Sequence, residues 1–282
     1  MGRPHTEFIQ TQALSWRTIG EKSTRPGAQV KRLSVDPDSR ACTVLLRHPK
    51  GWSFDEEHYL DDDEEIFVLS GALTIGDVTY SKGDYAYLPA GYPRPHMSAP
   101  DGADVLTYLE GEHKRIVGKA PEGGFDASTL VERISTEQVA WGGATDPNVA
   151  STGVRRLALR KDPKTGDTTW LLDIDETGMG DEVNRLETHP VVEEVFILSG
   201  EMHMPQGVLK QGAYFWRPPD IPHGPVGTKT GSLGIFRCKG GPLTTDWSEE
   251  TYPVQWNAPY NPELPEDVRE TLADSYDESL PY

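Results

Sequence analysis

The sequence predicts an all-β protein made of two similar barrels, and three observations support this prediction. The segment Glu64–Gly71 closely matches Glu193–Gly200, and Gly83–Pro89 matches Gly212–Pro218. Both matches have the same offset of 129 residues (193 − 64 and 212 − 83), which indicates an ungapped duplication of a whole domain. Short apolar runs also alternate with glycine and proline turn signals, a pattern typical of a sandwich or barrel rather than of alternating strands and helices.

The expected strands follow from these apolar runs. In the first half we expect strands at residues 41–47, 66–69, 72–75, 85–88 and 104–110. In the second half we expect strands at residues 154–159, 168–174 and 232–237. The pair 66–69 and 72–75 is expected to be two strands joined by a turn at Ser70 and Gly71.

The ends of the two halves are less regular. Residues 1–29 are expected to pack as an arm on the first barrel, and the likeness of residues 136–141 to 11–16 indicates that the duplication includes such an arm. Residues 128–134 are expected to form a short helix or a strand. We therefore divide the chain into residues 1–118 and 119–282. The proline-rich tail from 242 is expected to be extended, with one short helix near 266–272.

Composition limits the classes of function. A length of 282 residues suits two domains, and the net charge of −18 with a pI of about 4.8 argues against nucleic-acid binding. No apolar run approaches the ~20 residues that span a bilayer, and the N-terminus lacks the pattern of a signal peptide. The two cysteines, Cys42 and Cys238, are interpreted as small buried hydrophobes of a cytoplasmic protein rather than as a disulfide framework.

The candidate site lies in the second half. In a barrel, His189 and Glu193 can face inward, and a returning segment can bring His223 beside them. Two imidazoles and a carboxylate suit a divalent metal with open positions, although a purely structural cluster is the alternative. Glu187 lies on the same strand face as His189, so it is a fourth ligand or an acid that orients a ligand histidine. Glu194 is expected to face the other side of the strand in a structural ion pair.

These motifs resemble the two motifs of the cupin superfamily, and the whole chain resembles a bicupin. The resemblance implies two tandem double-stranded β-helix (jelly-roll) barrels with short helices. In the second half the motif positions are occupied by His189, Glu193, Gly200, Gly212, Pro218 and His223, while Glu187 replaces one motif histidine. In the first half they are occupied by His58, Glu64, Gly71, Gly83, Pro89 and Gly91.

The first half departs from the motif pattern. Leu60 replaces one ligand histidine, Arg94 replaces another, and His96 comes two residues late. If the loop bends back, His58, Glu64 and His96 can bind a metal. The favoured interpretation is a degenerate barrel that only stabilises its partner.

The resemblance implies a non-heme Fe(II) dioxygenase that acts on a small diketone, hydroxyketone or phenolic substrate. His189, His223 and Glu193 would hold the iron, and Glu193 and Glu187 are the candidate catalytic residues. The alternatives are a non-redox isomerase, lyase or decarboxylase that uses Mn, Zn or Ni, or a cupin sensor or binding protein without turnover. Arg217 is expected at the pocket mouth or in a surface ion pair. We expect a small-molecule substrate, no nucleic-acid or membrane partner, and leave a homodimer open.

Overall fold

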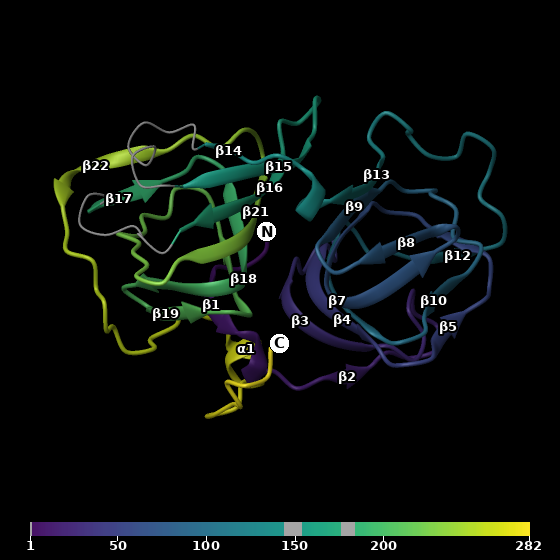
Figure 1. The fold of residues 1–282 in the computed structure, drawn as a ribbon, viewed down its shortest axis with the longest axis horizontal. Coiled ribbons are helices and arrows are strands. Elements are labelled where there is room, and N and C mark those ends of the chain that lie inside the picture. Colours follow the sequence, from purple (N-terminus) through teal and green to yellow (C-terminus); the bar gives the residue numbers. More distant parts are fainter. Residues whose placement is uncertain (1, 144–153, 176–183) are drawn as a thin grey trace. The chain divides into compact units, whose positions relative to one another are not determined.

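The computed structural model describes residues 2–143, 154–175 and 184–282, and its regular structure is almost entirely β (Figure 1). The chain forms two compact units. The first consists of the residues up to 3 together with 16–139, and the second of residues 4–15 and 140–282. Each unit contains one large antiparallel sheet and one two-stranded sheet, which is the all-β jelly-roll arrangement that the sequence predicts.

The large sheet of the first unit has a continuous path of seven strands among the described residues. Their order is β13 (Val131–Ser135), β9 (Asp84–Leu88), β7 (Glu64–Ile75), β11 (Ala103–Leu109), β4 (Cys42–His48), β3 (Gln29–Val35) and β2 (Arg17–Thr18). Attached to this path are β8 (Val78–Ser81), β10 (Met97–Ala99) and β5 (Trp52–Phe54). The small sheet pairs β6 (His58–Leu60) with β12 (Arg115–Val117).

The large sheet of the second unit repeats this order. It runs β1 (Thr6–Gln10), β20 (Ala213–Arg217), β18 (Val192–Met204), β21 (Ser232–Lys239), β16 (Thr168–Ile174), β15 (Arg155–Lys161) and β14 (Gly142–Gly143), with β19 (Gly207–Lys210) beside β18. The small sheet pairs β17 (Arg185–Thr188) with β22 (Asp246–Thr251). At the offset of 129, β20 and β18 correspond to β9 and β7, and β18 lies between β20 and β21 as β7 lies between β9 and β11.

The N-terminal arm does not pack where we expected it. Strand β1, drawn in purple among the green strands of the second unit in Figure 1, pairs with β20 rather than with the first sheet. Strand β13, which begins the second half of the sequence, pairs with β9 of the first unit. Edge strands satisfy the free backbone groups of a sheet regardless of sequence distance, so the arms of the two halves can exchange. Residues 128–134 therefore contribute a strand and not a helix.

The expected turn at Ser70 and Gly71 is instead a bend within one long strand, β7. Gly71 has a φ of +69°, and the pairing of β7 with β11 shifts register beside it. Gly200 in β18 is equivalent, with a φ of +75° and a register shift near residue 198. A Cβ atom at Gly200 would lie 2.1 Å from the carbonyl oxygen of Gly231. Glycine is required at this bend because another backbone approaches closely and φ is positive.

The two faces of β18 have different surroundings. Val195 and Ile197 point into the apolar core of the second unit, together with the free thiol of Cys238. On the opposite face, Glu194 accepts hydrogen bonds from Tyr214 at 2.7 Å and from Arg237 at 2.8 Å. The structural ion pair expected for Glu194 is confirmed. Cys42 is also buried and forms no disulfide.

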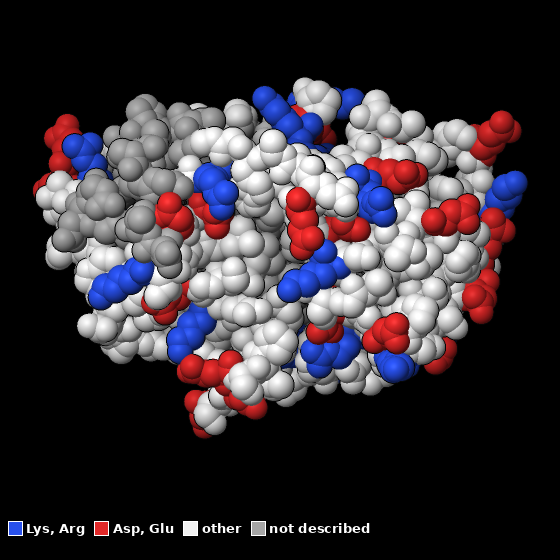
Figure 2. Space-filling model, viewed as in Figure 1, with Lys and Arg blue, Asp and Glu red and all other residues white. Residues whose placement is uncertain are grey.

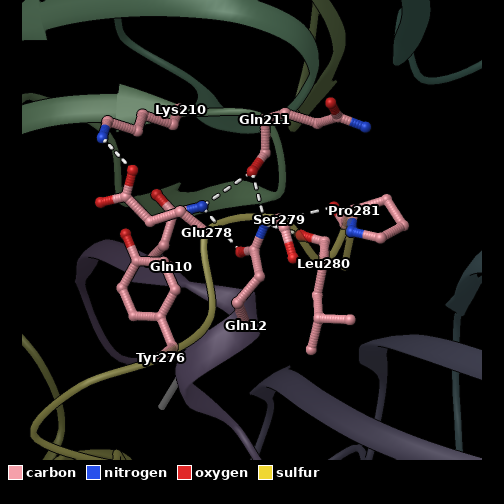
Figure 3. Close-up of a pocket in the computed structure, with 9 residues that line it drawn as sticks. All are labelled: Gln10, Gln12, Lys210, Gln211, Tyr276, Glu278, Ser279, Leu280 and Pro281. Atoms are coloured by element: carbon pink, nitrogen blue, oxygen red, sulfur yellow. Dashed lines mark hydrogen bonds and ion pairs between the residues drawn. The ribbon is translucent and has the colours of Figure 1, made fainter.

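The C-terminal tail packs against the second unit through polar contacts. Gln12 donates to the carbonyl oxygens of Leu280 and Pro281, and Lys210 forms an ion pair with Glu278 (Figure 3). These residues and their neighbours line a cavity of about 150 Å³. The short helix expected in the tail is α1 (Glu266–Arg269).

The visible surface carries acidic and basic side chains scattered among uncharged ones (Figure 2). In the described part of the chain, none of the helices has the length and apolar character needed to cross a membrane.

The backbone conformation at Gly200 leads to a prediction about the stability of the fold. Gly200→Ala should lower the free energy of unfolding by about 3 kcal/mol, since the left-handed backbone alone costs about 1–3 kcal/mol and the clash with the Gly231 carbonyl adds to it. Denaturant unfolding is the measurement. Gly143→Ala is the matched control because its Cβ would meet nothing within 4 Å. Equal stability of the two variants would contradict this account of the bend.

Candidate metal centre

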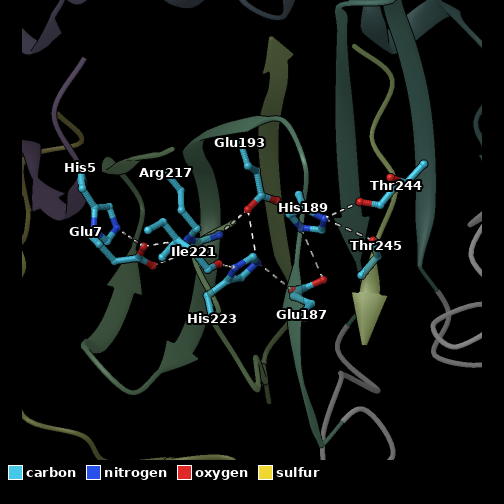
Figure 4. Close-up of polar contacts among 10 residues, drawn as sticks. All are labelled: His5, Glu7, Glu187, His189, Glu193, Arg217, Ile221, His223, Thr244 and Thr245. Carbon is cyan, nitrogen blue, oxygen red and sulfur yellow. Dashed lines mark hydrogen bonds and ion pairs between the residues drawn. The ribbon is translucent and has the colours of Figure 1, made fainter. Parts of the chain in front are cut away.

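Four side chains from different elements meet between the two sheets of the second unit (Figure 4). Glu187 lies on β17, His189 follows that strand, and Glu193 lies on β18. The loop after β20 carries His223 and is held against β17 by two backbone hydrogen bonds between Glu187 and His223, of 2.9 and 3.0 Å. The peptide N–H of Asp220 also donates to the carbonyl oxygen of His189 at 2.8 Å. Main-chain pairing therefore sets the spacing of the site.

Three of these residues form a compact set of possible ligands. One ligand atom from each of Glu187, His189 and His223 lies within 4.8 Å of the others. The Nε2 atom of His223 is 3.4 Å from Oε1 of Glu187, and Nε2 of His189 is 3.8 Å from Oε2 of Glu187. Glu193 lies at the edge of this set, 3.9 Å from His189 and 3.5 Å from His223.

The two histidine rings are oriented by backbone carbonyls. Nδ1 of His189 lies 2.9 Å from the oxygen of Thr244, and Nδ1 of His223 lies 2.9 Å from the oxygen of Ile221. A carbonyl can only accept, so each Nδ1 must carry the proton. In the neutral ring, Nε2 then presents a lone pair to the centre. Nε2 of His223 is buried and has no hydrogen-bond partner among the described residues.

The centre thus brings together the Nε2 lone pairs of two histidines and the negative charge of carboxylates. Burial would raise the pKa of Glu187, but the adjacent His223 and the nearby His189 and Arg217 hold that pKa below its usual range. Glu187 is therefore anionic at neutral pH. Its side chain is 24% exposed, whereas His189 and His223 are 4% and 3% exposed. A divalent cation would satisfy these donors, and the Glu187 side provides the approach from solvent.

Arg217 lies neither at a pocket mouth nor on the surface. Its guanidinium is buried, donates to Glu7 at 2.8 Å through Nε, and forms an ion pair with Glu193. Burial would raise the pKa of Glu7, but Arg217 and then His5 lower it to about 2. Because Arg217 binds one oxygen of Glu193, the geometry favours Glu187 as the third ligand, with Glu193 as a fourth.

The first unit arranges the corresponding residues differently. His58 and Arg94 form the backbone bridge that Glu187 and His223 form in the second unit. Glu64 is buried in ion pairs with Arg25 and Arg94. The metal set of His58, Glu64 and His96 is not formed. Among the described residues, only Glu187, His189 and His223 bring three possible ligand atoms within 4.8 Å of one another. At the position where the motif has a histidine, the first unit therefore carries the positively charged guanidinium of Arg94.

Sequence reasoning missed three contributors to these sites. Glu7 and Arg25 come from N-terminal segments that no motif connects to the barrel glutamates, and Thr244 contributes only its carbonyl. The one sign of these contacts in the sequence was Arg217, which interrupts the repeat because the equivalent residue in the first half is Leu88. A buried arginine requires acidic partners, and Glu7 supplies the second.

Comparisons with known proteins bear on the fold. A family model described as a domain of unknown function (DUF4437) matches residues 7–241. A search of curated proteins finds no match. A structure from Nostoc punctiforme, described as a putative dioxygenase, superposes with a TM-score of 0.77 at 19% identity over 89% of this chain and 92% of that chain.

Structures of Bacillus subtilis oxalate decarboxylase are also similar. A single-residue variant gives a TM-score of 0.55 at 13% identity, covering 86% of this chain and 79% of that chain. A structure from work on the Mn(II) centres of that enzyme gives 0.55 at 14% identity with the same coverage. At these identities the likeness concerns the fold alone.

The ion pairs of Arg217 generate a prediction. Arg217→Met should lower the free energy of unfolding by about 3–5 kcal/mol, because two buried carboxylates lose their shared cation. Arg155→Met, which removes a surface ion pair with Asp173, should cost less than about 1 kcal/mol. Chemical denaturation compares them. Similar losses in both variants would show that the buried position of Arg217 contributes little.

Proposed function

Because this chain belongs to the family described as a domain of unknown function (DUF4437), whose name specifies no activity, we propose its function from the site: a bicupin metal enzyme whose centre lies in the second barrel. The observation that carries the proposal is the convergence of two Nε2 lone pairs and the Glu187 carboxylate, with each Nδ1 directed to a carbonyl. Two histidines and one carboxylate with open positions are typical of non-heme Fe(II) oxygenases.

The proposed reaction is dioxygenation of a small diketone, hydroxyketone or phenolic substrate. Iron would be held by His189, His223 and Glu187, with Glu193 as a fourth ligand. When bound, the metal would supply coordination sites for the substrate oxygens and for dioxygen. The carbonyl of Thr244 keeps the His189 ring in one tautomer. Arg217 forms an ion pair with Glu193 beside the metal position, and the partly exposed Glu187 lies where substrate would enter.

One observation favours a second candidate, a non-redox lyase or decarboxylase with Mn(II). Glu193 brings a second carboxylate within 3.9 Å of His189, and carboxylate oxygens suit Mn(II) as well as they suit iron. The fold likeness to oxalate decarboxylase, with its Mn(II) centres, supports the same alternative.

The metal proposal can be tested by metal analysis. His189→Ala or His223→Ala should reduce bound metal more than tenfold, because each removes an Nε2 donor. Metal content per folded chain is measured on protein purified without chelators. His203→Ala is the matched control, since this buried histidine of the same unit contacts Glu201 outside the set. Full metal content in either ligand variant would refute the assignment.

The reaction class can be tested by oxygen dependence. On the dioxygenase proposal, Fe(II)-loaded protein should consume oxygen with diketones or phenolic ketones and show no turnover in strict anaerobiosis. An oxygen electrode with parallel product analysis is the measurement. Anaerobic turnover of a carboxylate substrate by Mn(II)-loaded protein would support the decarboxylase. Tight ligand binding without turnover would support a sensor.

A further inference from the structure

The first unit contains a buried charge cluster at the position that corresponds to the metal centre. Arg94 stands at the offset of His223 (94 + 129), and its backbone bridges to His58 through hydrogen bonds of 2.9 and 3.1 Å. The side chains of Arg94, Arg25 and Glu64 are each about 1% exposed. The same barrel frame therefore carries the guanidinium of Arg94 where the second unit carries the imidazole of His223.

The charges of this cluster do not balance. Glu64 accepts hydrogen bonds from Nη2 of Arg25 at 2.7 and 2.8 Å, and from Nη1 of Arg94 at 2.7 Å. These three buried side chains carry two positive charges and one negative charge. A buried charge without a counter-charge is strongly destabilising, so the set favours one more anion.

The neighbouring histidines do not change this balance. Burial, followed by the nearby Arg25, lowers the pKa of His48 to about 3. Burial also lowers the pKa of His58 to about 4, and Arg25 and Arg94 add to the effect. Both rings are therefore neutral at pH 7. The excess positive charge remains on the arginines.

One edge of the Arg94 guanidinium makes no hydrogen bond to the described residues. Its Nε and Nη2 atoms are buried and have no hydrogen-bond partner in the described part of the chain. These two N–H groups lie side by side on a guanidinium and form the fork that binds both oxygens of a carboxylate. Nε of Arg25 is likewise buried without a partner there. Water can accept from such donors, but it does not neutralise the excess charge.

We propose that the first barrel is a metal-free binding site for a small carboxylate, held bidentately by Nε and Nη2 of Arg94 and neutralised by Arg25. Glu64 fixes both guanidinium groups in place. The two barrels of one chain would then bind opposite charges. The proposal is independent of the activity proposed for the second barrel.

The test is the titration of the whole chain with acetate and formate at constant ionic strength, followed by calorimetry and thermal unfolding. The wild type should show saturable binding and a rise in Tm, with chloride at least tenfold weaker. Arg94→Gln should abolish both effects. Arg94→Lys keeps the charge but loses the fork, so it should bind at least tenfold more weakly. Arg47→Gln, which removes a partly exposed arginine of the same unit, should bind like wild type.

Glu64→Gln should change the affinity for acetate in the opposite direction to the Arg94 variants. It removes the internal carboxylate, so the affinity for acetate should rise at least tenfold. If Arg94→Gln fails to fold, Arg94→Lys and Glu64→Gln still decide the question. The proposal is overturned if the wild type shows no saturable binding, if chloride is equivalent to acetate, or if folded Arg94 variants bind like wild type.

Discussion

The site of the second unit depends on one buried guanidinium, that of Arg217. It lies between Glu7 on β1 and Glu193 on β18 and forms buried ion pairs with both carboxylates. The same contacts tie the N-terminal arm to the sheet that carries the site. Arg217 uses one oxygen of Glu193 and leaves the other facing His189. Arg217 therefore links the arm to the strand that carries Glu193.

The comparison of the two units shows how one backbone frame supports opposite electrostatics. The bridge between Glu187 and His223 recurs as the bridge between His58 and Arg94, so the loop returns to the same place in both units. In the second unit the returning side chain, that of His223, offers a lone pair, as a site proposed to bind a cation requires. In the first unit it is Arg94, which itself supplies the positive charge beside Glu64. On the two proposals above, the replacement of His189 by Leu60 and of His223 by Arg94 in the repeat would convert a cation site into an anion site.

The repeat explains why much of the fold and site was predictable. An offset of 129 placed equivalent strands between equivalent neighbours, and the period of two in a strand correctly sent Glu194 to the face opposite Glu193. The exchange of arms was not predictable, because a strand's alternation does not specify which sheet edge it joins. The pairing of Arg217 with Glu7 spans 210 residues and has no local signal. The bend at Gly71 was mistaken for a turn because both require a glycine with positive φ.

The C-terminal tail has a more specific role than covering the surface. The carbonyl of Thr244 accepts from Nδ1 of His189, and β22, which begins two residues later, pairs with the strand that carries Glu187. A ring free to rotate could present either nitrogen to a metal, whereas this carbonyl selects Nε2. His223 obtains the same constraint locally, from Ile221 two residues away. The orientation of one ligand thus depends on a segment far away in the chain, so the start of the tail is part of the site.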